Sequence, residues 1–222
     1  MPFSRRPSYY MAQQREWQPF ATYGILGAIV AFYIAELVVL ATADAALFQR
    51  LFVIDMHWPF EPWTLITSTL SHSPAGIAHI LFNGLVLFFF GPILERLIGW
   101  KRFLVLFFLA GAIAGVLQAL LQWYLFGQDV GALGASGAIM MVFGALMVVM
   151  PKEKILIWGI IPMPFWVAGL LFAAIDVLGA FDPGSGVGNF AHLSGLAIGL
   201  WVGWRLRTTM KRRGMHLVFG GR

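Results

Sequence analysis

Six long apolar segments dominate this chain, and they limit its fold more than any other feature. They lie at about residues 20–42, 77–98, 103–126, 136–150, 163–179 and 188–206. A helix that crosses a bilayer needs ~20 predominantly apolar residues. Composition agrees, because 59% of the residues are hydrophobic and only 11% are charged, whereas about a quarter of a soluble domain is charged. The sequence predicts an all-α polytopic membrane protein with six transmembrane helices.

Charged residues frame a single membrane domain. We expect an N-terminal tail at 1–19, the six-helix bundle at 20–206 and a basic tail at 207–222. Lys and Arg gather in both tails and in the turns at 96–102 and 152–154, while the remaining loops are mainly acidic. Basic loops stay on the cytoplasmic side, so both termini are predicted to be cytoplasmic, in a prokaryotic plasma (inner) membrane. The net charge of +5 is interpreted as an orientation signal, and no nucleic-acid partner is predicted.

Two connecting segments have unusual compositions. Residues 43–76 are rich in Phe, Trp and Pro, as segments that lie at a membrane interface are. Pro162 and Pro164 interrupt the apolar run that follows Pro151. Because proline is tolerated in the first turn of a helix, the fifth span is expected to begin near residue 163, with 155–161 as a connector.

The fourth segment contains a serine where the helix is expected to begin. Ser136 lies in Gly134-Ala135-Ser136-Gly137, and about 15 residues separate it from Pro151. A helix of that length reaches ~22 Å, less than the ~30 Å hydrocarbon core, so its start is predicted to be recessed below the outer surface. Unpaired N–H groups there suit a developing oxyanion. Alternatively, Ser136 is a small packing residue between helices.

The sixth segment contains His192, a candidate general base. His192 shares a helical face with Gly195 and Gly199, and that face can approach the helix that carries Gly137 closely. His192 would then lie beside Ser136 as general base. The chain has no cysteine, so a thiol nucleophile is excluded. Other interpretations of a membrane histidine are a hydrogen bond to a carbonyl, a metal ligand or a proton relay.

The second segment contains two side chains that can donate hydrogen bonds. His79 and Asn83 are four residues apart, so they lie on one face of a helix and can both point at one oxygen. We interpret them as donors that complete an oxyanion hole. The structural alternative is that Asn83 joins two helices and His79 caps a helix end.

Taken together, these motifs resemble the rhomboid family of intramembrane serine proteases over about residues 57–204. The matching motifs are His79-x-x-x-Asn83, Phe90-Gly91-Pro92-x-Leu94-Glu95-x-x-x-Gly99, Gly134-Ala135-Ser136-Gly137 and Ala191-His192-x-x-Gly195-x-x-x-Gly199. The resemblance implies a Ser136-His192 catalytic dyad and an acyl-enzyme. It also implies an oxyanion hole of His79, Asn83 and the Ser136 N–H, with no metal or other cofactor. Substrates would be single-span membrane proteins that enter past residues 163–187.

Some positions depart from the family pattern or carry other polar groups. Met140 stands where an aromatic residue is frequent, Trp63-Thr64 replaces a frequent Trp-Arg pair, and His72 is unusually far from His79 along the chain. Glu36 is expected to hydrogen-bond to a neighbouring helix or face a wet cavity. Asp176 could by its type complete a Ser-His-Asp triad, but nothing in its spacing aims it at His192. A dyad is therefore expected, with Asp176 at the interface.

Two other functions remain alternatives. A non-catalytic relative that binds membrane helices would lack Ser136 or His192, yet both are present. A small transporter or channel with Glu36, His79 and His192 as a proton path is typically built from inverted repeats, and none is found. The sequence predicts neither a particular substrate nor an oligomeric state.

Overall fold

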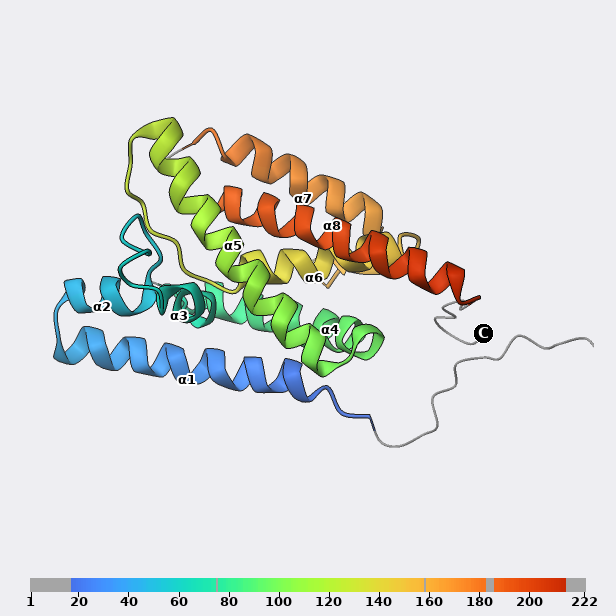
Figure 1. Cartoon of the computed structure of the whole chain (residues 1–222), viewed down its shortest axis with the longest axis horizontal. Coiled ribbons are helices and arrows are strands. Elements are labelled where there is room, and N and C mark those ends of the chain that lie inside the picture. Colours follow the sequence, from blue (N-terminus) through green and yellow to red (C-terminus); the bar gives the residue numbers. More distant parts are fainter. Residues whose placement is uncertain (1–16, 75, 158, 183–185, 215–222) are drawn as a thin grey trace, which may run out of the picture.

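A computed structural model describes residues 17–74, 76–157, 159–182 and 186–214. Most of the predicted N-terminal tail and half of the predicted C-terminal tail lie outside it. The described chain is a bundle of helices with one small hairpin (Figure 1). Its elements are α1 (Phe20–Thr42), α2 (Ala45–Phe52), α3 (Thr64–Leu70), α4 (Ile77–Ile98), α5 (Trp100–Phe126), α6 (Ser136–Val149), β1 (Lys154–Ile157), β2 (Ile161–Pro164), α7 (Phe165–Gly179) and α8 (Asn189–Arg212).

Three helices, α1, α4 and α5, are each long and apolar enough to cross a membrane. The helices α6 and α7 are apolar but shorter. Large apolar side chains cover the outside of the bundle, among them Ile34, Leu81, Val105 and Leu170. In a soluble protein such a surface would be a strong aggregation liability. The described chain is therefore an integral membrane protein.

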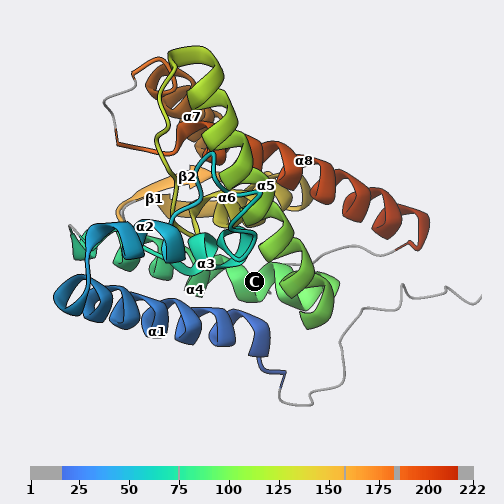
Figure 2. The same ribbon diagram turned by 60° about the vertical axis from the view of Figure 1, so that its left-hand side comes forward.

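The helix α6 is the innermost element of the bundle (Figures 1 and 2). An almost continuous run of its residues, Gly137–Ile139 and Met141–Leu146, is buried. It contacts α4, α5, α7 and α8, so any group that α6 carries at its start is enclosed by side chains from several other helices.

Two helices run further than their apolar segments predict. The helix α5 begins at Trp100 instead of residue 103, and α8 continues to Arg212, six residues past the predicted end at 206. The added turns of α8 contain Arg207 and Lys211. Lys and Arg are good helix formers and interact favourably with the C-terminal end of the helix dipole, so the helix continues where hydropathy falls.

The expected connector at 155–161 is an antiparallel hairpin, which the sequence analysis missed. β1 pairs with β2 from Lys154↔Pro164 to Ile157↔Ile161. Gly159 in the turn has φ +74°, a conformation that favours glycine. Phe165, the first residue of α7, donates its N–H to the Glu153 carbonyl at 2.9 Å, which joins the helix start to the hairpin.

The aromatic-rich segment 43–76 is partly helical. Asp44 begins α2 by accepting a hydrogen bond from the Leu47 N–H at 2.8 Å, as N-cap residues do. Further along, Ile54 and Ala132 exchange two backbone hydrogen bonds of 2.9 and 2.8 Å. This bridge ties the segment to the 127–135 loop that leads into α6.

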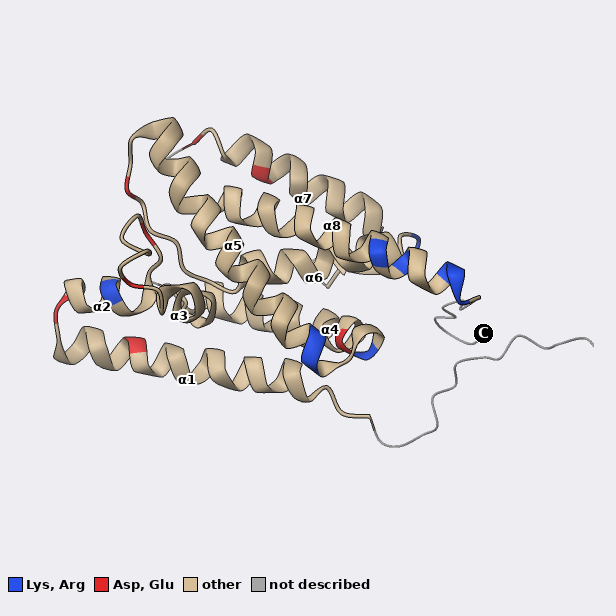
Figure 3. Ribbon diagram, viewed as in Figure 1, with Lys and Arg blue, Asp and Glu red and all other residues tan. Residues whose placement is uncertain are grey.

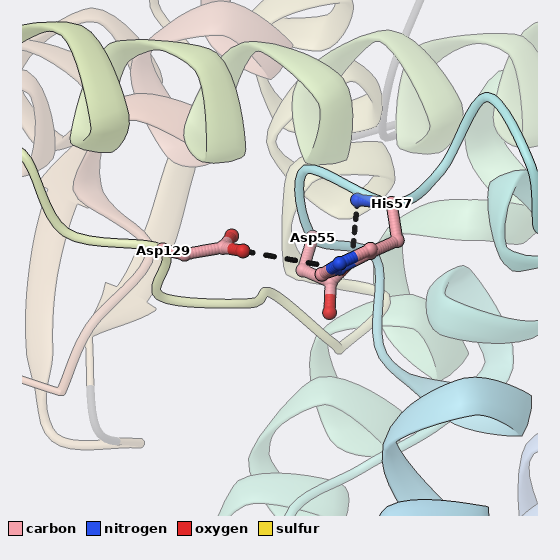
Figure 4. Close-up of side chains that lie close together, drawn as sticks. All are labelled: Asp55, His57 and Asp129. Carbon is pink, nitrogen blue, oxygen red and sulfur yellow. Dashed lines mark hydrogen bonds and ion pairs between the residues drawn. The ribbon is translucent and has the colours of Figure 1, made fainter.

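A second contact joins the same two loops (Figure 4). Asp55, His57 and Asp129 place one ligand-type atom each within 4.8 Å of one another. The Asp55 carboxylate accepts from the His57 N–H at 2.8 Å and lies 3.2 Å from its Nδ1, and Asp129 accepts from the Met56 N–H at 3.1 Å. Because donors of the chain already occupy these carboxylates, the cluster fastens the loops that lead to α3 and α6.

Buried carboxylates hold α1 in place. Glu95 on α4 accepts from the N–H groups of Ala21 and Thr22 at 3.1 and 2.8 Å, which are among the orphan donors at a helix start. Glu36, in the second half of α1, accepts from the His72 N–H at 3.0 Å. Its partner is thus in the loop between α3 and α4, whereas the sequence analysis expected a neighbouring helix or a wet cavity.

Candidate active site

Ser136 is the first residue of α6, and a constrained glycine precedes it. Gly134 has φ +126°, which a side chain would strain, and its N–H donates to the Ser68 carbonyl at 2.8 Å. This bond anchors the loop to α3 just before the helix begins. Ser136 therefore stands at a half-buried helix start, where the first N–H groups have no partner within the helix.

The structure brings His192 to Ser136. The Nε2 atom of His192 lies 2.9 Å from Ser136 Oγ. His192 is in the first turn of α8, where its N–H donates to the Gly188 carbonyl at 2.9 Å. A nucleophile and a base within hydrogen-bond reach are the geometric signature of an activated serine.

Glycines make this contact possible. A Cβ at Gly195 would collide with the Gly137 carbonyl oxygen, and one at Gly199 would collide with that of Met141. The two backbones of α6 and α8 therefore touch along the face that the sequence analysis proposed. That close approach brings the starts of the two helices, and with them Ser136 and His192, within reach of each other.

Asp176 faces the other side of the same imidazole, a contact that its spacing in the sequence did not indicate. Its Oδ1 atom is 2.8 Å from His192 Nδ1. Asp176 belongs to the last turns of α7 and is 5% exposed. Sequence spacing did not reveal this pair because it depends on how α7 is rotated against α8. The one signal for this pair in the sequence was that Asp176 is an acidic residue near the end of an otherwise apolar helix.

His79 lies next to the serine, as proposed. Gly134 lies between the two side chains. If it carried a Cβ, that atom would be 3.0 Å from Cε1 and 3.1 Å from Nε2 of His79. The same atom would be 3.8 Å from Ser136 Oγ. The imidazole of His79 and the Ser136 hydroxyl therefore flank the same glycine. His79 is on α4, so three helices, α4, α6 and α8, contribute to this region.

Asn83, one turn further along α4, is 4% exposed, and its Nδ2 has no hydrogen-bond partner among the described residues. An unpaired buried donor costs ~1–3 kcal/mol, and native structures retain few of them. A donor held without a partner on the face that carries His79 is suited to a transient acceptor such as an oxyanion.

His72 is a neighbour that the sequence analysis did not assign to the site. Its ring centre lies 5.0 Å from that of His79, and its Nδ1 is 3.1 Å from the Leu70 carbonyl oxygen. Burial, together with the nearby His79, lowers the pKa of His72 to about 4. His72 is therefore neutral at physiological pH. Its place behind His79 suggests that it packs and orients that ring.

The structure thus defines a helical membrane protein in which a serine at an internal helix start meets a histidine from the last helix. Residues 59–209 of the chain match the Rhomboid domain. The chain is 32% identical to rhomboid protease GlpG of Haemophilus influenzae over 186 residues, which are 80% of this chain and 90% of that protein. The chain belongs to the rhomboid family.

Two mitochondrial proteins are also similar. RHOMBOID-like protein 12 of Arabidopsis thaliana is 31% identical over 65% of this chain and 46% of its own length. Rhomboid protein 1 of Saccharomyces cerevisiae is 30% identical over 78% of this chain and 51% of its own length. The matched regions cover about half of these two longer proteins.

Proposed function

We propose that this protein is an intramembrane serine endopeptidase that cleaves single-span membrane proteins in or near the membrane. The observation that carries the proposal is the 2.9 Å distance between Ser136 Oγ and His192 Nε2. Membership of the rhomboid family and the similarity to a relative named as a rhomboid protease support it.

In the proposed reaction, His192 Nε2 accepts the Ser136 proton while Oγ attacks a backbone carbonyl carbon of the substrate. The tetrahedral intermediate places negative charge on the former carbonyl oxygen. His192 then donates its proton to the leaving amine, and an acyl-enzyme on Ser136 remains. A water molecule, deprotonated by His192, hydrolyses that ester and regenerates the serine.

Three donors are proposed to stabilise the oxyanion: the Ser136 N–H, the His79 ring and the Asn83 amide. Their support is the unpaired helix start, the position of His79 beside Gly134 and the unpartnered Asn83 Nδ2. Loss of one such donor typically lowers turnover by ~10²–10³. This scheme uses side chains of the chain itself and no metal or cofactor.

We also propose six spans with both termini in the cytoplasm. Lys and Arg side chains gather at the bundle end where α4 meets α5 and where α8 ends, while acidic residues lie mainly at the opposite end (Figure 3). Basic residues mark the cytoplasmic side. The 14 residues of α6 reach ~21 Å, too short for a full crossing, so Ser136 would sit below the outer surface. Domain limits of 20–206 follow from this topology.

The proposed substrates are membrane helices that unwind at small residues. A segment must be extended before its carbonyl can reach Ser136, and weak helix formers lower the cost of that change. By its place at the edge of the bundle, the α7 region at 163–187 is proposed as the route by which a substrate helix reaches the site.

The test is cleavage in lipid vesicles that contain the purified protein and a tagged single-span substrate with small residues near its outer end. The original protein is compared with Ser136→Ala and His192→Ala, and a fluorophosphonate probe reports on the reactivity of Ser136. Matched controls are Ser194→Ala on α8 and Thr209→Ala at the exposed far end of the same helix. Cleavage and labelling should disappear in the first pair and persist in the controls.

A different result would reverse the proposal. If the folded protein bound several substrates without cutting them and the probe did not label Ser136, the non-catalytic, helix-binding function would replace it. Cleavage that survived Ser136→Ala would show that another residue is the nucleophile.

A further inference from the structure

The buried carboxylate of Asp176 is aimed at the nitrogen of His192 that Ser136 does not use. Asp176 Oδ1 lies 2.8 Å from His192 Nδ1, while the opposite ring nitrogen lies 2.9 Å from Ser136 Oγ. The exposed fractions of the two side chains are 7% for Asp176 and 21% for His192. The three side chains therefore form a continuous chain of hydrogen bonds from α7 through α8 to α6.

This geometry decides which nitrogen carries the proton in neutral His192. An ionised carboxylate only accepts hydrogen bonds, so the hydrogen of the neutral ring is on Nδ1, pointing at Asp176. The Nε2 atom is then an acceptor, and the Ser136 hydroxyl is its donor. A general base for Ser136 requires this tautomer, because the other one would direct an N–H at the nucleophile.

Other contacts hold the outer end of α7 close to α8. A Cβ at Gly179 would lie 2.8 Å from Oδ1 of Asn189, the first residue of α8. In contrast, Leu170, Ile175 and Leu178 on α7 are exposed toward the surroundings of the bundle. The helix α7 is thus at the edge of the bundle, and Asp176 is directed inward.

We propose that Asp176 is a positioning residue that fixes the tautomer and orientation of His192, so that the site works as a triad contributed by α6, α7 and α8. This inference rests on the proposed function, because it assigns Asp176 a part in the reaction of Ser136 and His192. During acylation His192 becomes doubly protonated, and the adjacent carboxylate stabilises the imidazolium without taking its proton.

The test uses Asp176→Asn, Asp176→Ala and Asp176→Glu, with Glu153→Gln as the control, because Glu153 is an exposed acid just before β1. Cleavage in vesicles gives kcat and KM, and fluorophosphonate labelling gives the rate of acylation.

We expect Asp176→Asn and Asp176→Ala to lower kcat and the labelling rate by ~10² or more, since loss of an orienting carboxylate lowers turnover of serine hydrolases by up to ~10⁴. KM should stay within about twofold if only transition-state stabilisation is lost. Asp176→Glu should recover part of the loss, and Glu153→Gln should match the original.

A second readout does not depend on activity. Nitrogen NMR of protein labelled with ¹⁵N-histidine reports which ring nitrogen is protonated, and the signal of His192 is assigned by its absence in His192→Gln. The original should show the Nδ1–H form, and Asp176→Ala should lose that preference.

The outcomes separate this inference from the proposed function. An unchanged kcat and tautomer in Asp176→Ala would overturn the positioning role even if Ser136 proved to be the nucleophile. If kcat fell only in proportion to a loss of thermal stability while the tautomer stayed the same, the positioning role would also be overturned. Asp176 would then have a structural role. If the original neither cleaved nor reacted with the probe, the proposed function would fail. The NMR result would then show by itself whether Asp176 sets the tautomer.

Discussion

Thr22 at the start of α1 is bound twice by Glu95 near the end of α4. Its N–H and its hydroxyl donate to the same carboxylate oxygen, at 2.8 and 2.6 Å. Thr22 is fully buried and Glu95 is 1% exposed. Glu95 of α4 thus caps the N-terminus of α1, which has no capping side chain of its own.

Replacing this carboxylate should destabilise the bundle. In Glu95→Gln, an NH₂ group replaces one of the two carboxylate oxygens, so it would face the N–H of either Ala21 or Thr22. An unmade buried hydrogen bond costs ~1–3 kcal/mol. Unfolding in mixed detergent micelles, followed by tryptophan fluorescence, measures the change. The exposed Glu153→Gln is the control and should alter stability by less than ~0.5 kcal/mol. Equal effects of the two substitutions would contradict the capping role of Glu95.

Substitutions at the contact between α6 and α8 should abolish activity before they affect membrane insertion. In Gly195→Ala, the added methyl group would collide with the Gly137 carbonyl oxygen, so α8 must shift and carry His192 with it. Displacement of ~1 Å can cost 10²-fold in rate. Gly27→Ala on α1 is the matched control, because a Cβ there meets nothing within 4 Å. Cleavage assays and unfolding curves of the two variants give the comparison, and wild-type cleavage by Gly195→Ala would disprove the close contact.

Asn83→Ala should damage turnover far more than stability. The Nδ2 atom of Asn83 has no described partner to lose, whereas a missing oxyanion donor lowers kcat by ~10²–10³. The measurements are kcat in vesicles and the unfolding midpoint in micelles. A variant that lost stability and activity in proportion would show that Asn83 serves packing alone.

Acid should destabilise the protein through His72. Its pKa is about 4 in the folded protein, against 6.5 as the ordinary value. The unfolded state then binds more protons between these values, so the stabilisation is complete above pH 6.5 and is lost as pH falls toward 4. The full effect is on the order of 3 kcal/mol. Unfolding midpoints between pH 7 and pH 4 should fall less steeply in His72→Asn than in the original. Equal slopes for the two proteins would contradict this role of His72.

The sequence was sufficient to predict the helical segments and the meeting of Ser136 with His192. Apolar length locates membrane helices because the bilayer demands it. The glycines at 195 and 199 indicated which face of the last helix could approach another backbone. Each of these two signals, apolar length and glycine spacing, lies within a single segment, so it can be read directly from the sequence.

The contacts that the sequence did not predict depend on how separate segments pack against each other. Asp176 and His192 are 16 residues apart. The rotation of α7 that directs the carboxylate inward cannot be read from periodicity, because the rest of the helix is apolar on every side. His72 approaches His79 through a loop whose path follows from its contact with Glu36. The hairpin at 154–164 was mistaken for a connector because its short strands, with prolines in the second, carry no clear alternation.

The distance of 56 residues between Ser136 and His192 also has a meaning for biosynthesis. At ~5–20 residues per second, a ribosome adds His192 ~3–11 s after Ser136. During that interval the growing chain contains Ser136 but not His192. Under the proposed mechanism, the nascent chain would be inactive until its last helix is made, so it could not cut neighbouring membrane proteins before its own bundle is complete.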